Sequence, residues 1–271
     1  MPELPEVETT RRGLLSLTGQ RIKSVQVRNP SLRWPVPKDL PEILPAQRFL
    51  ELTRRAKYIL VRCEQGTLLL HLGMSGRLCL LEAFTPPGKH DHIDITFENG
   101  AILRLRDPRR FGAVLWTTQA PEKHPLIASL GVEPLEPAFN GEYLHRELRT
   151  RSAPIKNAIM DNHVIVGVGN IYASESLFRA RIHPKTPANK VNKARCEKLA
   201  NEIKDTLAAA IEAGGSSLRD FFGADGNPGY FQQTYYAYGR VGQPCLVCGG
   251  EIKNIKLGQR STFYCPKCQQ A

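Results

Sequence analysis

The sequence predicts an α+β fold, in which an antiparallel β domain precedes a helical domain and a small metal-stabilised hairpin. Three observations support this prediction. Short apolar runs separated by turn residues fill the chain to about residue 130, the apolar period becomes helical from Asn140, and four cysteines form two C-x-x-C pairs near the end. A chain of 271 residues has room for two domains, or for one domain with an appendage.

The first element expected is a helix close to the N-terminus. Pro5 suits the first position of a helix, where its missing N–H costs nothing. Glu6 favours the positive end of the helix, and an apolar stripe follows at Val7, Leu14 and Leu17.

Strands are expected over the rest of the first 130 residues. Glu98-Asn99-Gly100 is a strong hairpin signal between two apolar runs, and a second pair of runs flanks Cys63–Gly66. The expected strands are 21–27, 57–62, 67–72, 92–97, 101–106 and 112–116, with a proline-rich connection over 35–45. Short strands of this kind predict a β-sandwich.

The second half of the chain reads as helices. These are expected over 142–149, 155–160, 171–180 and 192–213, with Asn170 as the N-cap of the third and Gly214-Gly215 ending the fourth. Residues 221–230 contain three glycines and a proline and are expected to form a lid or a linker. The domains predicted are 1–130, a linker over 131–139, a helical domain with the lid over 140–230, and the hairpin over 231–271.

The composition points to a polyanionic partner. Lysine and arginine outnumber aspartate and glutamate by 37 to 26, which gives a net charge of +11. Nucleic acid is the first candidate and an anionic membrane the second, although a merely basic enzyme fits the charge as well. We find no apolar run of about 18 residues and no secretory signal, so we expect a cytoplasmic protein with no membrane span and, with nucleic acid as its partner, no membrane contact. In that reducing setting Cys63, Cys79 and Cys196 are expected to be small buried apolar residues.

The remaining four cysteines predict a metal site. Sixteen residues separate the pair Cys245 and Cys248 from the pair Cys265 and Cys268. This pattern fits one zinc ion held by four thiolates, with no open position, so the metal is expected to be structural. The segment between the pairs reads as a hairpin with Gly258-Gln259 at its tip, too short to bury a core of its own. Arg260, beside the tip, suits a phosphate contact or lies idle in solvent.

The N-terminus carries a candidate nucleophile. If Met1 is removed, Pro2 presents a secondary amine that titrates near 8, so a useful fraction is uncharged at neutral pH. Attack of this amine on a sugar C1′ or an aldehyde would give an iminium ion, and the neighbouring Glu3 could pass a proton. The alternative is a frayed terminus that leads into a surface helix.

Two loops and one turn complete the candidate site. Met74, Arg109 and Phe111 lie on loops and are the kinds of residue that enter a base stack and hold a kinked duplex. The alternatives are a methionine in the core and an Asp107–arginine ion pair. The turn 167–170 could bring backbone amides to a phosphate, or could be a plain helix corner.

Together these features resemble the formamidopyrimidine-DNA glycosylase family, the bacterial repair enzymes for oxidised guanine. The resemblance spans essentially the whole chain and is carried by Pro2–Thr9, Lys57–Tyr58, His71–Gly76, Lys89–His92, Asp107–Gly112, Gly167–Ala173, Tyr238–Arg240 and the four cysteines. It implies a β-sandwich flanked by helices, a helix–two-turn–helix domain, a zinc-finger hairpin, and damaged duplex DNA in the cleft between the domains with the damaged base flipped out.

The resemblance also implies residue roles. Pro2 would attack C1′, Glu3 would assist opening of the sugar ring, and Lys57 and Arg260 would donate protons for β- and δ-elimination. The residues expected to hold phosphates are His90, Arg109, Arg151, Lys156 and Asn170. Those expected to fill the vacated space and address the unpaired cytosine are Met74, Arg109 and Phe111. The segment 217–230 would close over the base.

Two other functions remain open at this point. An endonuclease VIII-type glycosylase would prefer oxidised pyrimidines, but its usual start has glycine where this chain has Leu4. A zinc-ribbon DNA-binding protein without catalysis would account for the charge and the cysteines, but would leave Pro2 and Glu3 unexplained. In each case we expect a monomer that needs no nucleotide cofactor.

Overall fold

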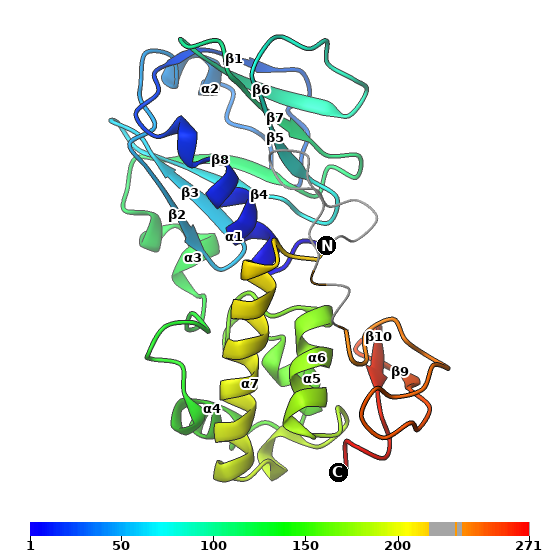
Figure 1. Cartoon of the computed structure of the whole chain (residues 1–271). Helices are drawn as coiled ribbons and strands as arrows, with labels where there is room; N and C mark the ends of the chain where they lie inside the picture. Colours follow the sequence, from blue (N-terminus) through cyan, green and yellow to red (C-terminus); the bar gives the residue numbers. More distant parts are fainter. Residues whose placement is uncertain (217–230, 232–234, 271) are drawn as a thin grey trace. The chain divides into compact units, whose positions relative to one another are not determined.

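A computed structural model describes residues 1–216, 231 and 235–270, so the predicted lid over 217–230 lies outside the described residues. The chain divides into two compact units (Figure 1). The first comprises Met1–Ala128 with the segment that begins at Ala213, and the second comprises Ser129–Glu212 with the chain from Phe231. The domain boundaries given above remain predictions.

The first helix, α1, spans Leu4–Gly13 and begins one residue earlier than the proline suggested. Glu3 is its N-cap, and Glu3 and Glu6 form a capping box in which each side chain accepts a hydrogen bond from the other residue's backbone amide. The predicted apolar stripe is confirmed, because Val7, Leu14 and Leu17 are all buried. Leu17 ends a short 3-10 turn that follows the helix.

Two four-stranded antiparallel sheets form the rest of the first unit. One sheet has the order β1(Ile22–Val27), β6(Asp91–Phe97), β7(Ile102–Arg106), β5(Arg77–Leu81). The other has the order β2(Glu51–Arg55), β3(Tyr58–Arg62), β4(Thr67–His71), β8(Ala113–Thr117). The predicted sandwich and both predicted hairpins are confirmed. Strand β2 was not predicted because it carries little apolar signal, and β5 was not predicted although Leu78–Leu81 is a short apolar run.

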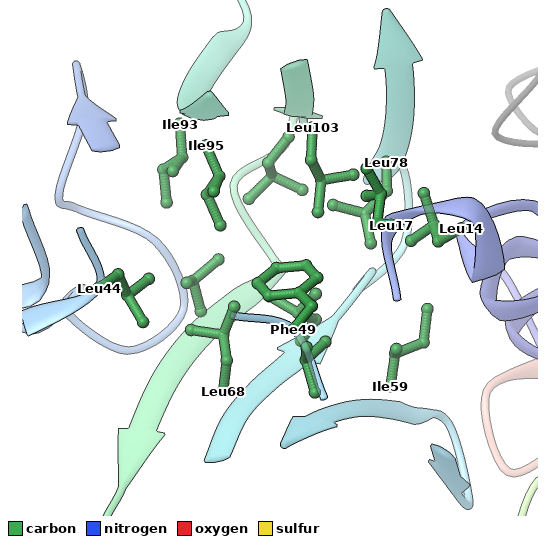
Figure 2. Close-up of a cluster of buried hydrophobic side chains, with 14 of the residues drawn as sticks. Leu14, Leu17, Leu44, Phe49, Ile59, Leu68, Leu78, Ile93, Ile95 and Leu103 are labelled. Carbon is green, nitrogen blue, oxygen red and sulfur yellow. The ribbon is translucent and has the colours of Figure 1, made fainter. Parts of the chain in front are cut away.

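A single apolar core fills the space between the sheets. Figure 2 shows Ile93, Ile95 and Leu103 from one sheet facing Ile59 and Leu68 from the other. Phe49 and Phe97 pack edge to face at their centre, with ring centroids 5.0 Å apart. Leu14 and Leu17, which follow α1, belong to the same cluster, so the core fixes the helix that carries the N-terminus.

Short elements join the strands. The proline-rich segment, which was expected as a connection, contains a brief helix, α2(Leu40–Ile43). A 3-10 turn over Pro121–Lys123 leads into α3(Pro125–Ala128). Cys63 is buried as predicted, and burial raises the pKa of its thiol to about 12. Cys79 is only half-buried, so that part of the cysteine prediction is wrong.

The second unit is helical and carries the hairpin. Its helices are α4(Gly141–Leu148), α5(Ile155–Ile159), α6(Asn170–Ala180) and α7(Lys193–Glu212), with a 3-10 turn over Ala188–Lys190. The four predicted helices are confirmed, and the buried face of α7 contains the expected Leu199, Ile203, Leu207 and Ile211. Cys196, also on α7, is buried as predicted. Strands β9(Lys253–Leu257) and β10(Arg260–Tyr264) form the predicted hairpin.

One local prediction in this unit is wrong. The N-cap of α6 is Gly169, and Asn170 is the first residue of the helix. Its side chain is held by tertiary partners: Oδ1 accepts from Lys156 Nζ and Nδ2 donates to the Ser261 carbonyl. A side chain that is engaged by another element cannot turn back to its own helix terminus.

Within the described residues, every helix is too short or too polar to span a lipid bilayer.

Candidate functional site

The first residues of the chain are fixed in place rather than frayed. Pro2 is buried and Glu3 is 2% exposed. The carboxylate of Glu6 holds this segment, because its Oε2 accepts the Glu3 N–H at 2.8 Å and its Oε1 accepts the Ser216 N–H at 2.8 Å. Glu6 is fully buried, so both bonds form away from water, where they are strong. The structure therefore contradicts the alternative of a frayed terminus.

Lys57 lies in the tight turn between β2 and β3, where Ala56 has a φ of 54°. It is half-buried and close enough to His71 to influence its charge. Burial, with Lys57 and Arg33 as secondary causes, lowers the pKa of His71 to about 4. His71 Nδ1 accepts the Gly73 N–H at 3.0 Å, so in the neutral ring the proton is on Nε2.

The two loops that carry Met74, Arg109 and Phe111 line one pocket of about 600 Å³. Met74 is 39% exposed and Phe111 is 42% exposed, which excludes the alternative of a methionine in the core. The Arg109 guanidinium stacks over the Phe111 ring, 4.8 Å from its centroid. The residues that line the pocket are Met1, Ser31, Leu32, Arg33, His71, Gly73, Met74, Arg109, Arg110 and Phe111. The pocket is thus flanked by exposed apolar tips and by cations.

Asp107 does not form the ion pair considered as an alternative. Its carboxylate accepts hydrogen bonds from the Ser75 hydroxyl and from backbone amides, rather than from an arginine in the described part of the chain. The Asp107 N–H donates to the His90 carbonyl at 2.9 Å, which places the half-buried His90 beside the same loops.

In the second unit, Lys156 and Asn170 form one polar cluster with β10. Lys156 is fully buried, and its ammonium donates to Asn170 Oδ1 (2.5 Å), to Thr262 Oγ1 (2.6 Å) and to the Ser261 carbonyl (3.3 Å). Three acceptors match the three protons of the ammonium. The cluster ties α5 and α6 to the strand that begins at Arg260.

The other two predicted cations of this unit lie at the surface. Arg151 is half-buried and pairs with Asp161 at 2.9 Å. Arg260 is exposed at the start of β10, directly after the hairpin tip. Both tip residues have positive φ, 52° at Gly258 and 65° at Gln259, as a two-residue hairpin turn requires. A Cβ on Gly258 would come within 3.0 Å of the Asn157 side chain, so the tip rests on α5.

The four paired cysteines converge on one point. Their sulfur atoms all lie within 4.8 Å of one another, with Cys248–Cys265 at 3.5 Å and Cys245–Cys268 at 3.9 Å. Four thiolates about 2.3 Å from a tetrahedral zinc would lie about 3.8 Å apart, so the residues fit this ion. The Gly250 amide and the neighbouring thiols lower the pKa of Cys248 to about 7, whereas burial raises the pKa of Cys265 and of Cys268, so Cys248 is the thiol of this group that ionises most readily.

Comparison with known proteins follows the same division of the chain. Three family models match it: the formamidopyrimidine-DNA glycosylase N-terminal domain over residues 1–114, the formamidopyrimidine-DNA glycosylase H2TH domain over 130–222, and the zinc finger found in FPG and IleRS over 242–271. The chain is 63% identical over 270 residues to the formamidopyrimidine-DNA glycosylase of Methylobacillus flagellatus, covering 100% of this chain and 97% of that protein.

The chain belongs to the formamidopyrimidine-DNA glycosylase family. It is therefore a DNA glycosylase of base excision repair with one structural zinc. A relative from Pseudomonas putida is 57% identical over the full length of both chains. Among solved structures, MutM from Thermus thermophilus is 37% identical with a TM-score of 0.89, over 99% of this chain and 98% of that one. The complex of Lactococcus lactis Fpg with an N7-benzyl-Fapy-dG DNA is 33% identical with a TM-score of 0.92 over both full chains.

The glycosylase fold also uses residues that sequence reasoning missed. Glu175 is 1% exposed on α6, and its carboxylate accepts the backbone N–H groups of Tyr236, Ala237 and Tyr238 at 2.9, 3.0 and 2.8 Å. Burial raises the pKa of Glu175, although the hydrogen bonds from those three amides and the charge of Arg179 act to lower it. The sequence does contain a signal, because Glu175 is the one acidic residue in Asn170–Ala180, a segment of mostly small and apolar residues. Glu6 was expected at the helix N-terminus and Asp107 was considered for an ion pair with an arginine, but the tertiary hydrogen bonds that their carboxylates accept were not predicted.

Proposed function

We propose that this glycosylase excises oxidised purines, namely 8-oxoguanine and formamidopyrimidines, from duplex DNA and then cleaves the strand as an AP lyase. The nucleophile is the secondary amine of Pro2, which is released from its peptide bond when Met1 is removed. The observation that supports this assignment is the placement of Pro2 and Glu3 directly before α1, where both are buried and the Glu3 N–H donates to the Glu6 carboxylate.

The proposed chemistry begins with attack of the Pro2 nitrogen on C1′ of the damaged nucleotide. The bond between C1′ and the base breaks and the base leaves with the electron pair, while Glu3 supplies a proton that opens the sugar ring. The nitrogen gives its proton to the departing base, and its lone pair then expels the ring oxygen O4′, which takes the proton from Glu3. The product is an iminium ion, which acidifies the C2′ hydrogen. Removal of that hydrogen expels the 3′ phosphate with a proton from Lys57, and a second elimination expels the 5′ phosphate with a proton from Arg260.

The same proposal assigns the DNA contacts. His90, Arg109, Arg151, Lys156 and Asn170 hold phosphates, and Met74, Arg109 and Phe111 fill the space left by the flipped base. The exposure of Met74, Arg109 and Phe111 beside one pocket supports this division. Lys156 would have to exchange one of its three protein acceptors for a phosphate.

The relatives support the substrate class. Lactococcus lactis Fpg has been captured with Fapy-dG DNA, with abasic-site DNA and with DNA that contains an oxidised pyrimidine. By similarity we extend damaged and abasic duplex DNA to this chain. The pyrimidine complex makes the endonuclease VIII-type preference a second candidate that the assay must separate.

The deciding experiment incubates the enzyme with duplexes that contain either 8-oxoguanine or thymine glycol, with and without borohydride. We expect faster excision of 8-oxoguanine, strand cleavage, and a trapped adduct that peptide mass spectrometry maps to Pro2. Faster excision of thymine glycol would support the alternative. An enzyme whose mature N-terminus is Pro2, but which gives no adduct with an excised substrate, would overturn the assigned chemistry.

A further inference from the structure

The two loops that present Met74 and Phe111 are interlocked through their backbones. Gly73 has a φ of 63°, and a Cβ added there would lie 2.3 Å from the Phe111 carbonyl carbon. A Cβ added at Gly112 would lie 2.9 Å from the His71 carbonyl oxygen. Contacts this close exclude any side chain at either position, so the loops 72–77 and 107–112 meet backbone to backbone.

One buried carboxylate holds this double loop together. Asp107 is fully buried; its Oδ1 accepts the Ser75 hydroxyl at 2.8 Å, and its Oδ2 accepts the Gly112 N–H at 2.8 Å. The Arg109 N–H is shared between Ser75 Oγ at 3.2 Å and Asp107 Oδ1 at 3.3 Å. Ser75 beside Met74, Gly112 beside Phe111 and the backbone amide of Arg109 itself are therefore all bound to one side chain.

The backbone of Asp107 anchors the unit to the sandwich. Its N–H donates to the His90 carbonyl at 2.9 Å, and its carbonyl lies 2.8 Å from His92 Nε2. His92 belongs to β6, so the double loop is attached to a strand of the core. Charge-assisted hydrogen bonds in a buried site are strong and directional, so the two loops form one rigid unit rather than two independent loops.

We propose that Asp107, acting through Ser75, is a positioning residue that makes Met74, Arg109 and Phe111 enter the DNA as one preassembled unit and thereby sets the enzyme's selectivity for the base opposite the lesion. This inference rests on the roles proposed above for those three residues. A pair of loops that is already ordered before DNA binds avoids the free-energy cost of ordering them during insertion. It also fixes the distance between the residue that fills the gap and the residue that reads the opposite base.

The test compares Asp107→Asn and Ser75→Ala with the wild type. An amide at position 107 cannot accept from Ser75 and Gly112 at once, since its nitrogen is a donor. The matched control is Asp94→Asn, because Asp94 is also buried but binds Arg104 and Arg28 in the sheet instead of the loops. Melting temperatures report stability. Single-turnover excision of 8-oxoguanine opposite each of the four bases reports selectivity, and 2-aminopurine fluorescence opposite the lesion reports insertion.

We expect Asp107→Asn to lower the ratio of excision rates between the best and the worst opposite base by about tenfold, with a smaller loss for Ser75→Ala and none for Asp94→Asn. The insertion signal should slow in the same order. A ratio that stays within twofold of wild type in both loop variants would overturn the inference, as would an equal loss in Asp94→Asn or a wild type without selectivity. A wild type that does not excise 8-oxoguanine would instead refute the proposed function.

Discussion

The N-terminal site and the zinc hairpin each hold a functional residue in place, but by different physical means. The helix that carries Pro2 is fixed by a large apolar core, to which α1 and both sheets contribute. The hairpin that carries Arg260 packs on a small buried cluster of Phe178, Ala237, Cys245, Ile252 and Cys265. Two of these five residues are zinc ligands. The metal therefore supplies folding free energy that so short a segment cannot obtain from an apolar core of its own. A change in the first region should therefore remove chemistry and spare the fold, whereas a change in the second should remove local structure.

The largest effect is expected for Pro2→Gly. The variant keeps an N-terminal amine but loses the rigid secondary one, and we expect base excision to fall by about 1000-fold. Single-turnover excision and borohydride trapping measure this loss. The melting temperature should stay at the wild-type value, because no core contact is removed; a trapping yield equal to wild type would contradict the role of Pro2.

The second effect concerns the metal. Cys248→Ser should release zinc, unfold the hairpin and lower the affinity for damaged duplex by about 100-fold at fixed salt, because the phosphate contacts carried by the hairpin are lost. Zinc content and fluorescence anisotropy are the measurements. Cys79→Ser is the matched control, since this half-buried cysteine lies on β5, outside the metal site. Unchanged affinity in a zinc-free Cys248→Ser protein would show that the hairpin folds without metal.

The third effect tests the sandwich through pH. Burial lowers the pKa of His71 to about 4, below the ordinary value of 6.5, so the unfolded chain binds this proton more readily than the folded chain. Stability is therefore lost as the pH falls from 6.5 towards 4. Between pH 7 and pH 4.5 the wild type should lose roughly 2 kcal/mol more than His71→Gln in urea unfolding. Parallel pH profiles for the two proteins would show that His71 is not held neutral.

The smallest effect is expected for Lys156→Met, which removes the three hydrogen bonds between α5, α6 and β10. DNA affinity should fall about tenfold, because Asn170 and the strand after Arg260 lose their anchor. Glu147→Gln is a suitable control, since it disturbs the Arg146–Glu147 pair on α4 instead. If the ammonium also contacts a phosphate, the slope of log affinity against log salt should drop by about one. An unchanged slope would make Lys156 a positioning residue only.

Local patterns were enough to predict most elements of both regions. Glu98-Asn99-Gly100 and Gly258-Gln259 predicted hairpins because positive φ at those turns limits which residues can occupy them. Strand β2, with the sequence ELTRR, was missed because it carries little apolar signal and forms by pairing with β3. The N-cap of α6 was predicted wrongly because the Asn170 side chain is taken by distant partners.

The sequence by itself determined which chemical groups the protein has at its disposal. These are a proline beside a glutamate near the N-terminus, four cysteines at the spacing of a zinc site, and cationic and apolar side chains on glycine-containing turns. These depend on residue type and on short spacing, both of which the chain states directly. Only the tertiary structure decided how these groups are held. Glu6 and Ser216 are separated by 210 residues, Lys156 and Thr262 by 106, and Ser75 and Asp107 by 32. Such pairs are set by how sheets and helices pack, and packing depends on the whole chain at once.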